Sequence, residues 1–199
     1  WNPADTTKRD IMLEYDSPIL LMQYAPNGQT LVFATRTDET PGLIGFFDLQ
    51  TNAVELAPEG LLASVRQLAI SPDGTIVAAG TSTTINYQGV GEVVLYDATT
   101  RRELRRPDLG ISQFFGLAFT PDGQSLAVAY QTKDQKSLVQ LIDPRTGEPI
   151  ETLDGVTDDV LALAFSADGA LLALGRRDGR VQVLDRASGS LRSAPGFHR

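Results

Sequence analysis

Residues able to carry out chemistry are few in this sequence, and they do not combine into a catalytic set. His198 is the only histidine and the chain contains no cysteine, so thiol nucleophiles and Cys-ligated metals are excluded and an imidazole has no partner. The sequence has no Gly-x-Ser-x-Gly segment, and no histidine stands close to a candidate nucleophile. We therefore predict that the chain is not an enzyme, with no catalytic residues, no metal and no cofactor.

Two further segments resemble binding motifs only in part. Asp154, Asp158 and Asp159 fall in one connection, "DGVTDD", whose oxygens could hold Ca²⁺. The spacing and terminal glutamate of an EF-hand are missing, so we interpret these residues as solvated turn carboxylates. The segment "GVGE" at 89–92 is part of a Gly-rich phosphate loop, but it precedes a strand rather than a helix, so we discount it.

Charge and composition limit the class of partner. The formal net charge is −8, and phosphate binding needs a concentrated positive surface, so we expect no nucleic-acid partner. An arginine group in "TTRRELRRPD" either guards an outer strand against edge pairing or meets an anionic partner; it comprises Arg101, Arg102, Arg105 and Arg106. No apolar run is long enough to cross a bilayer and no basic leader opens the chain, so we expect no membrane insertion. We expect a cytoplasmic location, with a periplasmic or extracellular one left open.

A repeated turn organises the chain. Four segments share an apolar run, a turn ending in Gly, and a second apolar run: "QYAPNGQTLVFAT", "AISPDGTIVAAG", "AFTPDGQSLAVAY" and "AFSADGALLALG". Pro and Asp or Asn suit the central turn positions and Gly takes positive φ, which predicts a tight hairpin between two strands. The turn glycines are spaced 46, 49 and 46 residues apart, at Gly28, Gly74, Gly123 and Gly169.

A second repeated element closes each unit. A strand ends in an apolar residue, then Asp, then a turn with Thr or Ser; the acidic residues are Asp48, Asp97, Asp143 and Asp185. Three times the distance from this Asp to the next turn Gly is 26 residues. The same offset before Gly28 falls on Asn2, so "WNPADT" is predicted to be a fifth copy of the strand end. A period of 40 to 50 residues that holds four short strands predicts a β-propeller blade.

These turns and strand ends resemble the WD-repeat family of β-propellers over essentially the whole chain. The resemblance implies an all-β fold with four antiparallel strands, A to D, in each blade. In the last unit we expect A at Val160–Ser166, B at Leu171–Gly175, C at Arg180–Asp185 and D at Ser190–Ser193. Nearly continuous apolar residues in A and B indicate strands covered on both faces by neighbouring blades.

Several family positions are changed here. The resemblance implies a hydrogen-bond network of His, Ser or Thr, Asp and Trp in each blade. Its His positions hold Tyr15, Leu61, Gly110 and Val156, its Trp positions hold Phe47, Tyr96, Ile142 and Leu184, and its turn Asp is matched clearly only by Asp178. We therefore expect apolar packing, rather than this network, to hold the blades together. His198 falls where the His of a following blade would stand, which we interpret as structural.

The predicted architecture is four complete blades plus an extra N-terminal outer strand at Lys8–Leu13. The predicted divisions are 1–16 for the end of a preceding blade, 17–58, 62–107, 111–154 and 157–195 for the four blades, and 196–199 for the start of a further blade. A spare outer strand at one end and an incipient blade at the other favour an internal part of a larger, seven-bladed propeller. A closed four-bladed ring is the alternative.

The B–C loops vary in length while the other spacings hold, and variable loops on a rigid scaffold are where binding is usually placed. The resemblance puts them on the same face as the D–A connections. We expect the following residues to project there as partner-binding candidates: Arg36, Asp38, Glu39, Asn86, Tyr87, Gln88, Lys133, Lys136, Arg176 and Arg177. The predicted function is a non-catalytic protein-interaction or sensor module, whose partner is another protein or an adjacent domain. The alternatives are a ligand-binding or enzymatic propeller, similar to lactonases or quinoproteins, with a site at the channel mouth, and a purely structural part of a larger assembly.

Overall fold

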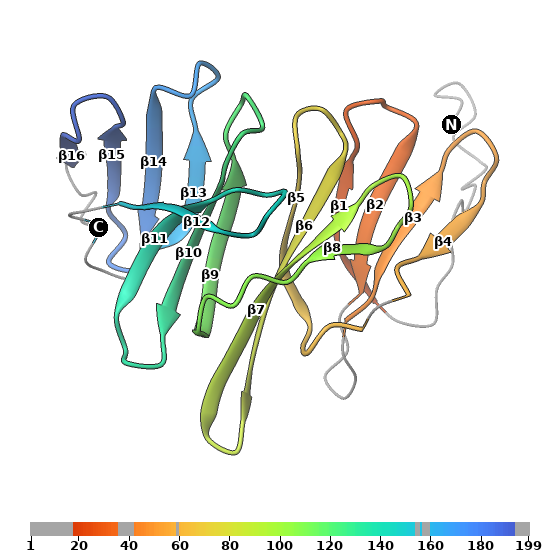
Figure 1. Ribbon diagram of the computed structural model, residues 1–199, viewed down its shortest axis with the longest axis horizontal. Coiled ribbons are helices and arrows are strands. Elements are labelled where there is room, and N and C mark those ends of the chain that lie inside the picture. The colour runs from red at the N-terminus through yellow and green to blue at the C-terminus, as the bar shows by residue number, and fades with distance from the viewer. Residues whose placement is uncertain (1–17, 36–41, 59, 154–155, 157–159, 194–199) are drawn as a thin grey trace, which may run out of the picture.

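The computed structural model describes residues 18–35, 42–58, 60–153, 156 and 160–193, and in these residues every regular element is a β-strand. Sixteen strands form four antiparallel sheets of four consecutive strands each, set side by side along an arc (Figure 1). Sheet 1 contains β1 Ile19–Tyr24, β2 Thr30–Thr35, β3 Ile44–Asp48 and β4 Val54–Leu56. Sheet 2 contains β5 Val65–Ile70, β6 Ile76–Ile85, β7 Gln88–Asp97 and β8 Glu103–Arg105. Sheet 3 contains β9 Ile111–Phe119, β10 Leu126–Thr132, β11 Ser137–Ile142 and β12 Pro149–Thr152. Sheet 4 contains β13 Val160–Phe165, β14 Leu171–Arg176, β15 Val181–Asp185 and β16 Leu191–Ser193.

The turn between the first two strands of each sheet has the predicted geometry. Its glycine has a φ of 66° to 73° in all four sheets, a conformation that costs glycine little because it has no Cβ. In sheets 2, 3 and 4 the turn Asp accepts a hydrogen bond from a hydroxyl two residues earlier, as Asp73 does from Ser71 at 2.6 Å. This hydroxyl bond, together with a backbone N–H, lowers the pKa of Asp73, Asp122 and Asp168 below the usual 3.8.

The Asp at the end of each third strand caps the next turn. Asp97 accepts N–H bonds from Thr99 and Thr100 at 2.8 and 2.7 Å, and Asp48, Asp143 and Asp185 repeat the pattern. These backbone donors lower the pKa of Asp48, Asp97 and Asp185, because they stabilise the carboxylate form. The repeated Asp therefore serves a local structural purpose.

Three apolar clusters hold the sheets together, one at each interface between neighbouring sheets. Alternate residues of one strand enter different clusters: in β7, Val94 and Tyr96 pack toward sheet 1, and Val93 and Leu95 toward sheet 3. Residues at the family's Trp positions lie in the interior, since Phe47, Tyr96, Ile142 and Leu184 are at most 5% exposed. Apolar packing thus dominates the contacts between sheets, as the changed family positions indicate.

The all-β prediction with four blades is confirmed, and the expected strands of the last unit agree with β13 to β16 within one residue at each end. One expectation needs correction. The connection that carries Asn86, Tyr87 and Gln88 is predicted to be a variable B–C loop, but β6 and β7 continue into it as a paired hairpin down to Ile85 and Gln88. Trp1-Asn2, the spare strand at Lys8–Leu13, the carboxylates of "DGVTDD" and His198 lie outside the described residues. The proposed division into blade ranges stays a prediction.

Candidate functional site

The hairpin between β6 and β7 projects beyond the ends of the other strands (Figure 1). Its two strands have ten residues each, whereas the second and third strands of the other sheets have five to seven. At its tip, Asn86 and Tyr87 have φ values of 50° and 63°, which fits a two-residue turn whose twist matches the strands. Positive φ is rare for an aromatic residue, and such strain tends to be found at functional sites. Tyr87 is fully exposed at this tip.

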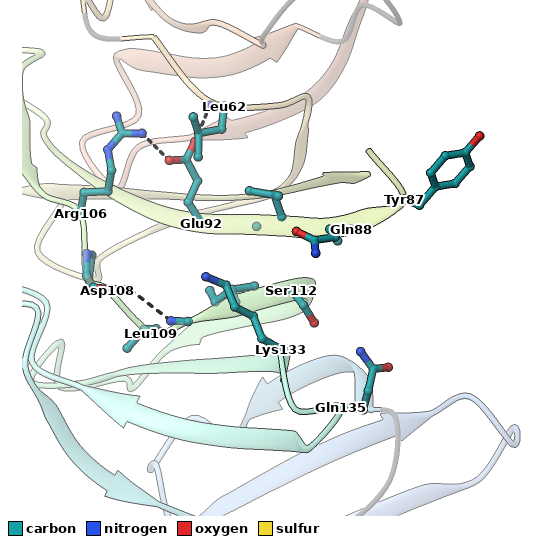
Figure 2. Close-up of a pocket in the computed structure, with 16 residues that line it drawn as sticks. Leu62, Tyr87, Gln88, Glu92, Arg106, Asp108, Leu109, Ser112, Lys133 and Gln135 are labelled. Atoms are coloured by element: carbon teal, nitrogen blue, oxygen red, sulfur yellow. Dashed lines mark hydrogen bonds and ion pairs between the residues drawn. The ribbon is translucent and has the colours of Figure 1, made fainter. Parts of the chain in front are cut away.

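A cleft of about 550 Å³ lies beside this hairpin (Figure 2). Ligand-binding pockets commonly measure roughly 300 to 1,000 Å³. One wall is the start of β7 and the other is the connection from β8 to β9, with the β10–β11 turn at the rim. The cleft is lined by Leu62, Tyr87, Gln88, Gly89, Val90, Gly91, Glu92, Arg106, Pro107, Asp108, Leu109, Gly110, Ile111, Ser112, Lys133 and Gln135. It therefore joins B–C hairpins and D–A connections on one face, as the sequence predicts for those loops.

Glu92 is the one carboxylate among the buried polar residues of the described chain. It accepts a 2.5 Å hydrogen bond from the Leu62 N–H and forms an ion pair with Arg106. Arg106 also bonds Glu103 at 2.7 Å and the Gly60 carbonyl at 3.1 Å. Hydrogen bonding to Glu103 and the attraction of Glu92 raise the pKa of Arg106, so it stays charged at any ordinary pH. This cluster ties the connections on both sides of sheet 2 together and makes one end of the cleft rigid.

The glycines of the "GVGE" segment allow two sheets to approach closely. A Cβ on Gly89 would lie 2.5 Å from the Ser112 carbonyl oxygen, and one on Gly91 would lie 2.6 Å from the Ile111 side chain. Only glycine permits β7 to meet the start of β9 at this distance. The segment lies in β7 and brings the two walls of the cleft together by close packing.

A second, more polar hollow of about 360 Å³ lies next to the first. The two hollows share residues of the hairpin and of the neighbouring strand starts, namely Tyr87, Gly89, Ser112 and Gln135. The remaining lining is mostly hydroxyl and amide groups, contributed by Arg66, Ser82, Thr83, Thr84, Gln113 and Gln131. The β6–β7 hairpin is therefore bounded by recessed surface that offers both apolar and hydrogen-bonding groups.

The predicted partner-binding residues divide into three groups. Gln88 and Lys133 line the cleft, while Tyr87 borders it at the hairpin tip next to Asn86 and its ring points away from the other two side chains (Figure 2). Lys136 does not line the cleft, Arg176 bonds Gln182 at 3.0 Å and pairs with Asp178 at 3.6 Å, and Arg177 lies over the Phe115 ring at 6.0 Å. Arg36, Asp38 and Glu39 lie outside the described residues.

Sequence reasoning missed the Glu92–Arg106 cluster. A signal was present, because Glu92 stands directly before the apolar run "VVLY", where a charge needs a partner. Within the arginine group, Arg101 lies 4.7 Å from the centroid of the Phe46 ring and pairs with Glu55, while Arg106 is held by Glu92. Two of these four arginines therefore contribute to packing between elements rather than only guarding a strand edge.

The cleft offers exposed apolar surface, amides and four charged side chains, of which Glu92 and Arg106 form an ion pair, and the other two are Asp108 and Lys133. Within the described residues no group of three His, Cys, Asp or Glu side chains is arranged to hold a metal ion. No helix in the described part of the chain has the length and apolar character needed to span a membrane.

Comparison with known proteins agrees with this architecture. The family model described as "WD domain, G-beta repeat" matches residues 147–185, from the outer strand of sheet 3 through β15. An uncharacterised WD repeat-containing protein of Synechocystis is 30% identical over 66% of this chain and 35% of its own length. WD repeat-containing protein SL1-17 of Schistosoma mansoni is 30% identical over 73% of this chain and 44% of its own length. The Periodic tryptophan protein 2 homolog of Dictyostelium discoideum is 27% identical over 94% of this chain and 19% of its own length.

The fold has a counterpart among solved structures. The structure of U3-55K superposes with a TM-score of 0.73 at 19% identity, over 94% of this chain and 54% of that one. Four side-by-side sheets of four antiparallel strands define a β-propeller arrangement. The match to one WD repeat, the similarity to WD-repeat proteins and the fold together support a WD-repeat propeller. It spans less than half the length of the curated relatives it matches.

Proposed function

We propose that this chain is a non-catalytic protein-interaction module that engages its partner through the face carrying the B–C hairpins and D–A connections. Proteins with WD repeats are typically interaction scaffolds, which supports the general class of function. The observation that supports this particular face is the projecting β6–β7 hairpin, with a fully exposed Tyr87 beside a cleft of about 550 Å³. Tyrosine is enriched among the residues that contribute most to protein interfaces, because it buries a large area at low entropic cost.

The partner is another protein or another domain of a longer chain. The cleft combines apolar surface, as at Leu62 and Leu109, with amides of Gln88 and Gln135 at its rim. Interfaces commonly have this composition, with an apolar centre and a polar margin. The Glu92–Arg106 cluster supplies a preorganised wall, which reduces the entropy lost on binding.

The test compares protein capture by matched tyrosine variants. The intact chain, Tyr87→Ala and Tyr24→Ala are used to capture proteins from an extract of the source organism, and recovered proteins are quantified by mass spectrometry. Tyr24 is 62% exposed on the outer face of β1, so it controls for loss of an exposed tyrosine elsewhere. We expect Tyr87→Ala to weaken the affinity for the captured partner by about tenfold or more, and Tyr24→Ala to leave it unchanged.

A second variant removes the hairpin without disturbing the sheet. Replacing residues 84–89 by Asn-Gly keeps the Thr83–Val90 pair in register below a two-residue turn. The proposal predicts loss of the partner with an unchanged unfolding curve. Capture of the same proteins at the same affinity by both hairpin variants would overturn it.

A further inference from the structure

The outer edge of β7 is unpaired over half of its length. β7 pairs with β6 at every position from Gln88 to Asp97, but with β8 only at Leu95 and Tyr96. A two-residue turn makes Ile85 and Gln88 a hydrogen-bonded pair, so the N–H and C=O groups of every second residue from Gln88 point to β6. The backbone groups of Gly89, Gly91 and Val93 therefore point away from β6. The same alternation appears at Asp97, whose N–H bonds the Arg102 carbonyl at 2.9 Å.

Pro107 explains why this edge stays open. In sheets 1 and 3 the residue after the fourth strand donates to the third strand, with Ala57 N–H to the Ile44 carbonyl at 2.9 Å and Leu153 N–H to the Val139 carbonyl at 2.8 Å. The pairing of Leu95 with Arg105 places Pro107 opposite Val93, and proline has no N–H to donate. The ladder ends there, and in the described part of the chain no strand continues beside Gly89–Val93.

The cleft runs along this open edge (Figure 2). Its apolar surface includes Leu62, which is 53% exposed, and Leu109 in the opposite wall. Asp108 lies in the wall that faces β7 and Lys133 lies at the rim, and neither forms an ion pair within the described residues. An extended segment placed here would meet backbone donors and acceptors on one side, and an apolar surface between two opposite charges on the other.

Building on the proposed function, we propose that the partner contributes an extended peptide segment that adds to sheet 2 as a strand along Gly89–Gly91, the partly exposed stretch of this edge. The main-chain groups of Gly89 and Gly91, which are partly exposed, bond alternate residues of the segment, which is how strand addition generates affinity; Val93 is fully buried opposite Pro107 and takes no part. An apolar side chain of the segment packs on Leu62, an acidic residue faces Lys133 and a basic residue faces Asp108. The added strand occupies the place that β8 leaves when it stops before Pro107.

The test uses a phage-displayed library of linear peptides, selected on the intact chain and counter-selected on the chain with the Asn-Gly shortened hairpin. Selected peptides are resynthesised with an N-methyl group on one backbone nitrogen at a time. Strand addition predicts that methylation at alternate residues abolishes binding, while methylation at the residues between them changes the affinity less than about threefold. Bound peptide should also slow amide hydrogen exchange at Gly89 and Gly91, with little change at Val90 and Glu92, whose N–H groups already bond β6.

The charge assignment has its own variants. Lys133→Glu and Asp108→Lys should each weaken the selected peptides by about five- to tenfold, and peptides with exchanged charges should recover the affinity for the double variant. Lys136→Glu in the same turn serves as control, because Lys136 does not line the cleft. Three outcomes would each overturn the proposal. In the first, no peptide is enriched on the intact chain relative to the chain with the shortened hairpin. In the others, the selected peptides tolerate N-methylation at all positions, or two copies of the chain pair through this edge without any peptide. If Tyr87→Ala still abolishes protein capture while Gly89 and Gly91 stay unprotected, the interaction face stands and strand addition does not.

Discussion

The inner sheets and the two end sheets have the same repeat but differ in burial. At the position six residues before the turn Gly, Leu68, Leu117 and Leu163 are 1% to 9% exposed, whereas Met22 of sheet 1 is 65% exposed. On the opposite side, Val93 and Val139 are fully buried, whereas Val181 of sheet 4 is 46% exposed. Identical strand positions are therefore core or surface according to whether a neighbouring sheet covers them. In this fold, contacts between neighbouring sheets supply most of the free energy of unfolding.

The largest effect is expected when the same side-chain volume is removed from an inner sheet and from an end sheet. Ile76 and Leu171 each follow their turn Gly by two residues, yet Ile76 is 4% exposed and Leu171 is 40% exposed. We expect Ile76→Ala to lower the free energy of unfolding by about 2 to 4 kcal/mol, because it leaves a cavity at the interface of sheets 2 and 3. Leu171→Ala should cost less than about 1 kcal/mol. Urea unfolding followed by circular dichroism measures both, and equal losses would contradict the comparison.

A second test adds volume instead of removing it. Gly80 and Gly175 both lie six residues after their turn Gly. A Cβ on Gly80 would lie 2.1 Å from the Phe114 ring, whereas one on Gly175 would lie 3.3 Å from the Ala162 Cβ. Gly80→Ala should cost about 1 to 3 kcal/mol through overpacking, and Gly175→Ala should stay within about 0.5 kcal/mol, since alanine also restricts the unfolded chain.

Thermal unfolding of the two alanine variants provides the measurement. Combining Gly80→Ala with Phe114→Leu should recover part of the loss, because the smaller side chain yields space to the new methyl group. If the stability losses of Gly80→Ala and Phe114→Leu simply added in the double variant, the clash with Phe114 would not be the cause of the loss in Gly80→Ala.

A hydrogen-bonded side chain offers a third comparison. Gln67 of β5 donates to the Leu117 carbonyl and accepts from the Leu117 N–H, both at 3.0 Å, which links sheets 2 and 3. Gln67→Leu should cost about 1 to 3 kcal/mol, because it leaves two backbone groups of Leu117 without partners. Gln182→Leu in sheet 4 removes an exposed bond to the Ser193 hydroxyl and a bond from Arg176 at 3.0 Å; it should cost less than about 1 kcal/mol, because both partners are side chains that can turn to water. Amide exchange at Leu117 should accelerate in the first variant alone, and unchanged exchange there would refute the role of Gln67.

The smallest expected effect is on stability at acidic pH, and the turn of sheet 1 provides a control because it has Asn in place of Asp. Asn27 occupies the turn position held by Asp73, Asp122 and Asp168, and its amide oxygen accepts the N–H groups of Gln29 and Thr30 at 2.9 and 3.1 Å. The three carboxylates have lowered pKa values, so folding favours their charged form. Their contribution to stability is present above pH 3.8 and is lost as the pH falls through their folded-state pKa values.

The triple variant with Asn at these three positions should be slightly less stable than the parent chain near neutral pH, because it lacks the contribution of the carboxylates, and should lose less stability on acidification. Unfolding curves recorded over a pH series down to and below 3.8 test this expectation. If the stability of the two chains fell with pH in the same way, groups other than these three carboxylates would determine the acid sensitivity.

The fold was predictable because its signals are local. Gly74 in positive φ and Asp97 at a strand end each determine one turn through their own chemistry. The constant 26 residues from a strand-end Asp to the next turn Gly, as from Asp97 to Gly123, and the spacing of 46 to 49 residues between turn glycines report the blade period. The candidate site was predictable only as a face. That Gln88 and Lys133 line one cleft with Tyr87 exposed at its border depends on how far β6 and β7 continue, which the mixed Thr-rich sequence did not show. The partners of Arg106 come from a preceding connection and another strand, so no sequence spacing reveals them.

The two-sided burial of β7 has a consequence for how its pairing is chosen during folding. Val93, Val94, Leu95 and Tyr96 are all fully buried, so the usual alternation of polar and apolar residues is missing. A slip of one residue would therefore exchange one set of apolar side chains for another, and hydrophobicity alone would hardly oppose it. The alignment must come from the ends of the strand, where Asn86-Tyr87 and the Asp97 turn admit a single connection length. In this chain the turns set the register of strand pairing, and the apolar strands between them need only pack against their neighbours.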